Sequence, residues 1–180
     1  GVTTVPLSYD HKPDLPQERA RFEKAGLTYV EETARDGSVI PKVQLKENVK
    51  MALSRAFGDF DFKANPDLPQ DEQAIVCVPE VIVRRRDESK DLYVVLACDG
   101  VWDVMSNDEV GAFVAEKGRG GDCSLTEVGE FLLSECLSKG SEDNMSVVIV
   151  SLTSGERGSS GGGGGGDVLE GMKRLNFEEE

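Results

Sequence analysis

The sequence has 180 residues, 38% of them hydrophobic, and a net charge of −14 at pH 7. This length suits one ordinary domain with its own core, and the negative charge argues against nucleic acid or an anionic membrane surface as a partner. No apolar run approaches the ~18 residues that cross a bilayer. The first residues, GVTTVPLSYD, include neither an initiator methionine nor a signal-like segment. We therefore expect a part of a longer protein, not secreted by this segment.

The N-terminal third predicts one helix after an extended entry. Residues 1–9 are expected to be extended, and Asp14 is expected to cap a helix over 15–26 that has Pro16 in its first turn. Gly26 is a natural left-handed C-cap for that helix. The single histidine, His11, lies in a turn before a proline, and we expect it to form local hydrogen bonds rather than to act in catalysis.

The next part of the chain predicts an irregular, flap-like subdomain over residues 27–63. It contains two short β-like pieces, 27–31 and 38–45, and a segment rich in helix formers at 51–58. Residues 74–85 are expected to form a strand pair, or one strand interrupted at a proline.

The C-terminal half alternates strand and helix signals. The apolar run 92–97 predicts a buried strand, and 146–152 predicts another. Between them, Ser106 with Glu109 and Ser124 with Glu127 have the spacing of capping boxes, which predict helices over 107–117 and to about Lys139. The Gly/Ser-rich residues 154–166 are typical of a flexible linker, and the acidic tail 167–180 is expected to form a short helix or to remain disordered.

The cysteines do not predict a zinc site. They have no C-x-x-C spacing and no neighbouring histidine, so we expect buried free thiols in a reducing compartment, the cytoplasm or the nucleus. They are Cys77, Cys98, Cys123 and Cys136.

The candidate site consists of carboxylates at strand ends. Asp99 ends the first predicted strand, and Asp143 comes just before the second. If these strands are antiparallel neighbours, both carboxylates lie at one edge of the sheet, whereas parallel strands would separate them by roughly 20 Å. Asp103 and the Gly100 carbonyl add oxygen ligands of the kind that Mg²⁺ or Mn²⁺ prefers, and such a centre can activate water for attack on phosphorus. The alternative is a tight turn with solvated aspartates.

Four motifs in order now carry a family resemblance. They are DHKPDLPQERARFEKAG, LSRAFGDFD, LACDGVWDVMSNDEV and KGSEDNMSVVIV. Together they resemble the C-terminal half of the type 2C metal-dependent serine/threonine protein phosphatases, the PPM family. The resemblance assigns residues 1–153 to the C-terminal portion of that catalytic domain, an α+β fold built as a four-layer α-β-β-α sandwich with antiparallel sheets.

The resemblance also implies a site and an activity. By resemblance, Asp99 and Asp143 are ligands of a centre with two Mg or Mn ions, and Asp103 joins Asp99 at a weaker third ion. Members of the family hydrolyse phosphoserine and phosphothreonine in phosphorylated protein substrates.

Two departures from the family pattern bear on this chain. The family's N-terminal half carries a glutamate, an Asp-Gly-His-Gly run and a phosphate-binding arginine, none of which is present here, and the flap sequence differs at residues 47–55. We therefore expect the missing N-terminal half to be a partner and the chain alone to be inactive. A haloacid-dehalogenase-like phosphatase is disfavoured because that chemistry needs an aspartate where Val101 stands. A catalytically silent phosphatase-like binding module remains the alternative.

Overall fold

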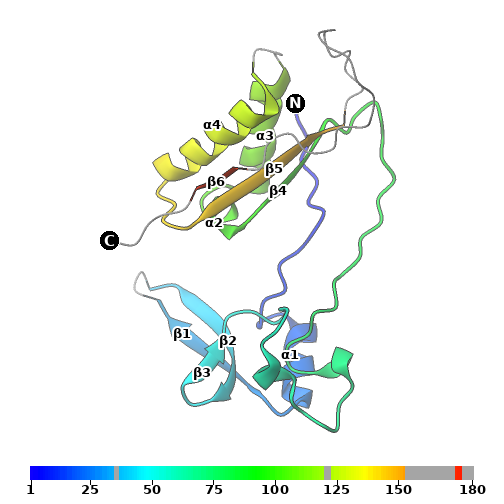
Figure 1. Ribbon diagram of the computed structural model, residues 1–180, viewed down its shortest axis with the longest axis vertical. Helices are drawn as coiled ribbons and strands as arrows, with labels where there is room; N and C mark the ends of the chain where they lie inside the picture. Colours follow the sequence, from blue (N-terminus) through cyan, green and yellow to red (C-terminus); the bar gives the residue numbers. More distant parts are fainter. Residues whose placement is uncertain (35–36, 120–122, 153–172, 176–180) are drawn as a thin grey trace. The chain divides into compact units, whose positions relative to one another are not determined.

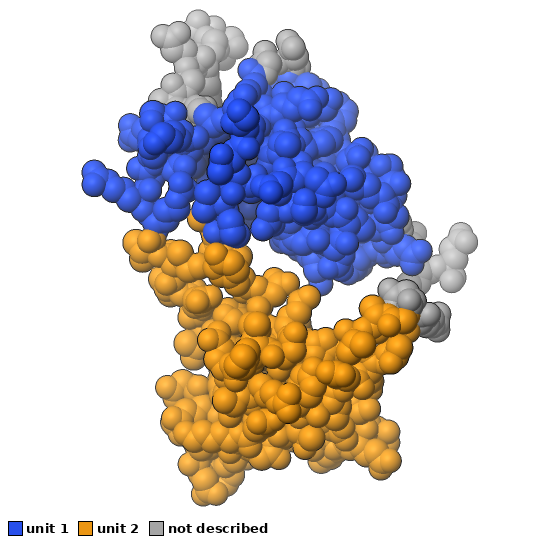
Figure 2. Space-filling view, turned by 180° about the vertical axis from the view of Figure 1, so that it is seen from behind, with its two compact units in different colours: residues 1–6, 84–180 blue, residues 7–83 orange. Residues whose placement is uncertain are grey.

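The computed structural model describes residues 1–34, 37–119, 123–152 and 173–175 (Figure 1). For residues 173–175 it describes the backbone alone. The chain forms two compact units, which are described separately (Figure 2). Unit 2 comprises Leu7–Val83, and unit 1 comprises Gly1–Pro6 with Arg84–Glu180. Among the described residues, no helix is both long and apolar enough to span a membrane.

Unit 2 combines one helix with a three-stranded antiparallel sheet in the order β1-β2-β3. Its elements are α1 (Pro16–Lys24), β1 (Thr28–Thr33), β2 (Val39–Lys46), β3 (Val49–Met51) and two 3₁₀ turns, Phe60–Lys63 and Gln70–Glu72. Its core is formed by Phe22, Ala25, Val43, Phe62, Ala74 and Ile75. The two predicted β-like pieces correspond to β1 and β2.

Helix α1 confirms its predicted end but not its predicted cap. Gly26 follows with φ +90°, the left-handed conformation expected of a helix stop. The N-cap residue is Leu15 rather than Asp14, and no side chain caps the helix. Pro16 at the first helical position lacks an N–H, so the first turn of the helix has one unpaired donor fewer.

Two segments of unit 2 differ from the sequence prediction. Residues 51–58 are not helical, and the chain turns sharply through left-handed conformations at Gly58 (φ +68°) and Asp59 (φ 50°). In the 74–85 segment, the only bridge within the described residues joins Val76 to Arg55 in parallel. The strand prediction for this segment is wrong because a strand needs a neighbour to hydrogen-bond with, and the described chain supplies one only at Val76.

Unit 1 has a three-stranded antiparallel sheet in the order β4-β5-β6. Its elements are β4 (Tyr93–Ala97), α2 (Asp99–Trp102), α3 (Asn107–Arg119), α4 (Leu125–Ser138), β5 (Met145–Ser151) and β6 (Lys173–Leu175). Helices α3 and α4 cover one face of this sheet (Figure 1). Their buried side chains meet those of β5 in one core, which includes Val110, Val114, Val128, Leu132, Val147 and Ile149.

Both predicted capping boxes are present in unit 1. The Ser124 backbone N–H donates to Glu127 at 2.7 Å, and the Ser124 hydroxyl accepts from the Glu127 N–H at 3.3 Å. Ser106 and Glu109 form the same pair of bonds at 2.8 and 3.3 Å. Hydrogen bonds from Ser106, followed by one from Lys139, lower the pKa of Glu109 to about 2. The starts of α3 and α4 are therefore fixed by local side chains.

Other expectations for unit 1 have mixed outcomes. The predicted linker, 154–166, lies outside the described residues, and so does most of the predicted Gly-rich turn at 118–121. The tail was expected to be helical or disordered, but its described part, 173–175, forms strand β6. All four cysteines are free, but only Cys136 is buried and Cys77 is exposed. The prediction of buried thiols is therefore wrong for Cys77.

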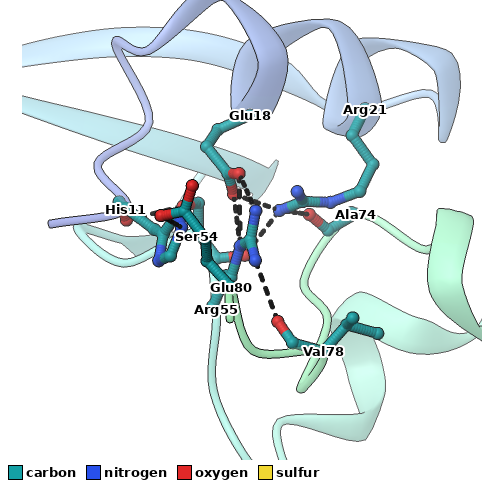
Figure 3. Close-up of polar contacts among 8 residues, drawn as sticks. All are labelled: His11, Glu18, Arg21, Ser54, Arg55, Ala74, Val78 and Glu80. Atoms are coloured by element: carbon teal, nitrogen blue, oxygen red, sulfur yellow. Dashed lines mark hydrogen bonds and ion pairs between the residues drawn. The ribbon is translucent and has the colours of Figure 1, made fainter. Parts of the chain in front are cut away.

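A buried carboxylate connects three segments of unit 2 (Figure 3). Glu18 of α1 has a fully buried side chain, and it accepts hydrogen bonds from Arg21 at 2.7 Å and from Arg55 at 2.6 Å. Arg21 also donates to the Ser54 carbonyl at 2.7 Å, and Arg55 donates to the Val78 carbonyl at 2.9 Å. One ionised side chain thus joins α1 to the loop around residue 55 and to the segment 74–78.

His11 lies beside this cluster and has partners far away in the sequence rather than local ones. Its carbonyl accepts from the Ser54 hydroxyl at 2.6 Å, and its ring Nε2 lies 3.6 Å from a carboxylate oxygen of Glu80 (Figure 3).

The arginines determine the protonation state of Glu18. Burial alone would raise its pKa, but hydrogen bonds from Arg55 and then Arg21 outweigh that effect and lower the pKa from 4.5 to about 2. Ionised Glu18 therefore stabilises the folded unit fully above pH 4.5, and this contribution is lost as the pH falls towards 2.

We expect Glu18→Gln to lower the free energy of unfolding by about 3–5 kcal/mol at pH 7, because two largely buried guanidinium groups lose their counter-charge. The difference from the parent chain should shrink as the pH falls towards 2. Urea unfolding at several pH values measures both effects. The control is Glu23→Gln on the same helix, which removes the exposed pair with Arg19 and should cost less than about 0.5 kcal/mol. Equal costs for the two variants would contradict this account.

Candidate functional site

The pairing of β4 with β5 decides where the predicted site residues lie. The two strands are antiparallel, as the sequence argument required, with Ala97 opposite Val147. One residue further on, the Cys98 N–H donates to the Ser146 carbonyl at 3.3 Å. Asp99 follows β4 and Asp143 precedes β5, so both aspartates lie at the same end of this strand pair.

Asp99 and Asp103 are related by one helical turn. Helix α2 begins at Asp99, and the Asp103 N–H donates to the Asp99 carbonyl at 2.8 Å. Residues four apart in a helical turn share a face. The two carboxylates are therefore on the same side of α2, as a shared ion would need.

The loop before β5 lies directly against the start of α2. A Cβ atom at Gly100 would lie 2.8 Å from the Asn144 carbonyl oxygen and 3.4 Å from the Asp143 Cβ. The buried Ser141 hydroxyl donates to the Gly100 carbonyl at 2.7 Å. This carbonyl, a candidate ligand in the sequence, therefore already accepts one hydrogen bond and retains one lone pair.

The three carboxylates are exposed to solvent and lack basic partners. Asp99 accepts from the Gly100 N–H at 3.1 Å, and Asp143 accepts from the Asn144 N–H at 2.7 Å, each through Oδ1. Among the described residues, no lysine or arginine forms an ion pair with Asp99, Asp103 or Asp143. The three carboxylates remain hydrated, so burial of their charge gives no reason to expect a bound cation.

The donor chemistry fits a hard divalent cation, but the set of ligands is partial. Carboxylate and carbonyl oxygens are the ligands that Mg²⁺ and Mn²⁺ prefer. Within the part of the chain that the structure describes, however, no three acidic, histidine or cysteine side chains are grouped to hold a metal ion. The described residues bring the loops of Asp99 and Asp143 together without forming a closed shell, and the ligand assignment stays a prediction.

Sequence reasoning missed the residues that hold this edge together. Besides Ser141, Cys98 contributes through its thiol, which accepts from the Ser146 N–H at 3.2 Å and contacts the Asn144 carbonyl at 3.3 Å. These contacts join residues more than 40 positions apart. No local spacing indicates them, and only the antiparallel pairing makes them possible.

Comparison with known proteins identifies the class. A family model described as "Protein phosphatase 2C" matches residues 1–145. The chain therefore belongs to the protein phosphatase 2C family, as the motifs predicted. Its α+β fold with antiparallel sheets is confirmed by solved phosphatases of this kind.

Individual relatives are similar along most of the chain. Protein phosphatase ppm-1.A of Caenorhabditis elegans is 43% identical over 141 residues, which are 78% of this chain and 27% of that protein. Human protein phosphatase 1A is 38% identical over 153 residues, which are 85% of this chain and 36% of that protein. A crystal structure of a phosphatase from Toxoplasma gondii matches with a TM-score of 0.65 and 31% identity, covering 95% of this chain and 45% of that one. The chain thus spans about a third of the length of these curated relatives.

We expect Gly100→Ala to destabilise unit 1 by about 1–3 kcal/mol, because the added methyl group would meet backbone and force the loop before β5 away from α2. Urea unfolding of the chain measures the change. The control is Gly129→Ala in α4, where the added atom would lie 3.4 Å from a Val147 methyl group, an ordinary van der Waals contact. It should be neutral, or stabilising by up to about 1 kcal/mol. A Gly100→Ala chain as stable as the parent would show that the close approach is not required.

Proposed function

We propose that this chain is part of a metal-dependent protein serine/threonine phosphatase and contributes Asp99, Asp143 and Asp103 to its metal centre. The observation that carries the proposal is the antiparallel β4–β5 pairing, which brings the loops of Asp99 and Asp143 together in a chain of the protein phosphatase 2C family. Solved relatives include one named serine-threonine phosphatase 2C from Toxoplasma gondii, with a TM-score of 0.62 and 27% identity.

The roles of the three aspartates follow from their positions. Asp99 and Asp143 each hold one carboxylate oxygen on a neighbouring backbone N–H, which orients the side chain and leaves Oδ2 for a cation. Asp103, on the same face of α2, joins Asp99 at a weaker third ion. Two Mg²⁺ or Mn²⁺ ions, when bound, supply an activated water and neutralise the phosphate charge. The substrate class is phosphoserine and phosphothreonine in proteins.

We further propose that the catalytic unit includes a segment of the domain that lies upstream of Gly1. The partial ligand set supports this proposal. Support also comes from the segment after Val76, where Val81 and Val83 are 76% and 91% exposed. Extended apolar segments without ladder partners are typical of strands that pair with another part of a fold. Four free cysteines favour a reducing compartment, the cytoplasm or the nucleus.

We expect the isolated chain to have negligible phosphatase activity and to self-associate, because its metal shell is incomplete and its extended segments expose apolar side chains. Fusion to the upstream part of a related domain should restore hydrolysis of a phosphothreonine peptide that depends on Mn²⁺. Phosphate release and the mass in solution measure these outcomes. A monomeric, active chain would mean that the upstream part is unnecessary, and an inactive, well-folded fusion would favour the silent binding module.

In the active fusion, we expect Asp99→Asn and Asp143→Asn each to lower kcat/KM by at least about 100-fold. Removing a single hydrogen-bond donor to the transition state already costs an enzyme about 100-fold in rate, and loss of a metal ligand should cost at least as much. Asp103→Asn should slow turnover with less loss of tight metal binding. Stability should hardly change, since removing neighbouring like charges does not weaken a metal-free site. Steady-state kinetics and Mn²⁺ titration measure these effects, with Asp108→Asn on the exposed start of α3 as the control. Normal turnover of Asp143→Asn would refute its assignment as a ligand.

A further inference from the structure

The hydroxyl of Ser141 joins the loop before β5 to helix α2. It donates to the Gly100 carbonyl at 2.7 Å, and the Ser141 side chain is buried. In a longer helix this carbonyl would accept from the Val104 N–H, four residues further on. Since α2 is a single turn, the Val104 N–H donates instead to the carbonyl of the residue after Gly100, at 3.3 Å. The Ser141 hydroxyl thus supplies the hydrogen bond that completes the turn carrying Asp99 and Asp103.

Ser141 is itself held by the end of α4. Gly140 has a left-handed conformation there (φ +91°), and the Ser141 backbone N–H donates to the Cys136 carbonyl at 3.0 Å. The Gly140 N–H donates to the Leu137 carbonyl at 3.0 Å, and the two bonds together form a Schellman motif. Cys136 belongs to the buried core of unit 1. The hydroxyl therefore extends from a helix end that is fixed independently of any ion.

A second tie lies on the other side of Asp143. The Cys98 thiol donates to the Asn144 carbonyl at 3.3 Å and accepts from the Ser146 N–H at 3.2 Å. The segment that carries Asp143 is therefore joined on both sides to residues 98–100.

These two ties act against the repulsion between like charges. Asp99 is the middle residue of 98–100, so the ties hold its loop and the loop of Asp143 together although the two carboxylates repel each other. A site whose groups are held in place before the ion arrives binds that ion more tightly. Groups that orient metal ligands from behind typically change metal affinity about 10–100-fold.

We propose that Ser141 is a positioning residue of the metal centre, and that with Cys98 it sets the separation of the Asp99 and Asp143 carboxylates. This inference rests on the proposed phosphatase function. Discrimination between Mg²⁺ and the larger Ca²⁺ depends on the size and flexibility of the cavity. The tie through Ser141 therefore raises both the affinity for a small divalent cation and the preference for Mg²⁺ over Ca²⁺.

The first experiment tests the tie in the 180-residue chain without metal, by hydrogen exchange and mass spectrometry. Ser141→Ala should make exchange at least about threefold faster in the peptides that contain Asp103 or Ser146. Ser124→Ala is the matched control, because it also removes a serine hydroxyl from unit 1, where that hydroxyl accepts from the Glu127 N–H at 3.3 Å. It should leave both peptides unchanged. Equal exchange in the parent and Ser141→Ala chains, or the same acceleration in the control, would overturn the proposal.

The second experiment measures the binding of Mn²⁺, Mg²⁺ and Ca²⁺ to the fusion described above, by titration calorimetry. Ser141→Ala should weaken Mn²⁺ binding at least about tenfold and lower the ratio of Mg²⁺ to Ca²⁺ affinity at least about threefold. Cys98→Ala, which breaks the other tie, should do the same and carries the test if Ser141→Ala fails to fold. Ser124→Ala should change neither quantity, because a general loss of stability does not alter ion preference. At saturating Mn²⁺, kcat of the two tie variants should stay within about twofold of the parent value, since no reacting group is removed.

Asp143→Asn in the same titration separates this inference from the proposed function. If Asp143→Asn loses Mn²⁺ while Ser141→Ala and Cys98→Ala bind all three ions as the parent does, the positioning role is overturned and the ligand assignment stands. If Asp143→Asn also binds as the parent does, the ligand assignment fails, and the positioning role fails with it.

Discussion

The antiparallel pairing of β4 with β5 is the constraint on which the rest of unit 1 depends. The chain leaves β4 at Cys98, passes through α2, α3 and α4, and returns beside its starting point at Met145. This return brings Asp99 and Asp143 to one end of the strand pair and presses the loop before β5 against Gly100. It also leaves the other edge of β5 free to receive β6. The position of the candidate site is thus a consequence of one strand pairing.

The elements that the sequence predicts well are those with local determinants. Capping boxes at Ser106 and Ser124 fix where α3 and α4 begin, and the apolar runs around them match β4 and β5 within a residue or two. The sequence does not show that β4 and β5 are antiparallel. It shows only that Asp99 and Asp143 can share a site if these strands are antiparallel neighbours. The expectation that these aspartates bind metal ions comes from the family motifs, because carboxylates in a turn are equally consistent with solvated side chains.

The failed predictions involve interactions that no local pattern records. Residues 51–58 are rich in helix formers, but Arg55 in that segment bonds to Glu18 and bridges to Val76, and these tertiary contacts override propensity. The segment after Val76 has the composition of a strand and finds no neighbour among the described residues. Leu15 rather than Asp14 is the N-cap because the residue before a proline avoids the helical region, so the helix begins only at Pro16.

The two units use carboxylates in opposite ways, and the contrast supports the functional assignment. Glu18 is buried, accepts bonds from two arginines and has a lowered pKa, so its charge is already neutralised by the protein. Asp99, Asp103 and Asp143 are exposed, and Asp99 and Asp143 each accept a hydrogen bond from the next backbone N–H in the chain. A carboxylate neutralised by arginine has no charge left to attract a cation, whereas one oriented by a backbone amide keeps an oxygen free for it. Glu18 is therefore distinguished from the candidate ligands by its arginine partners, and not by being a carboxylate.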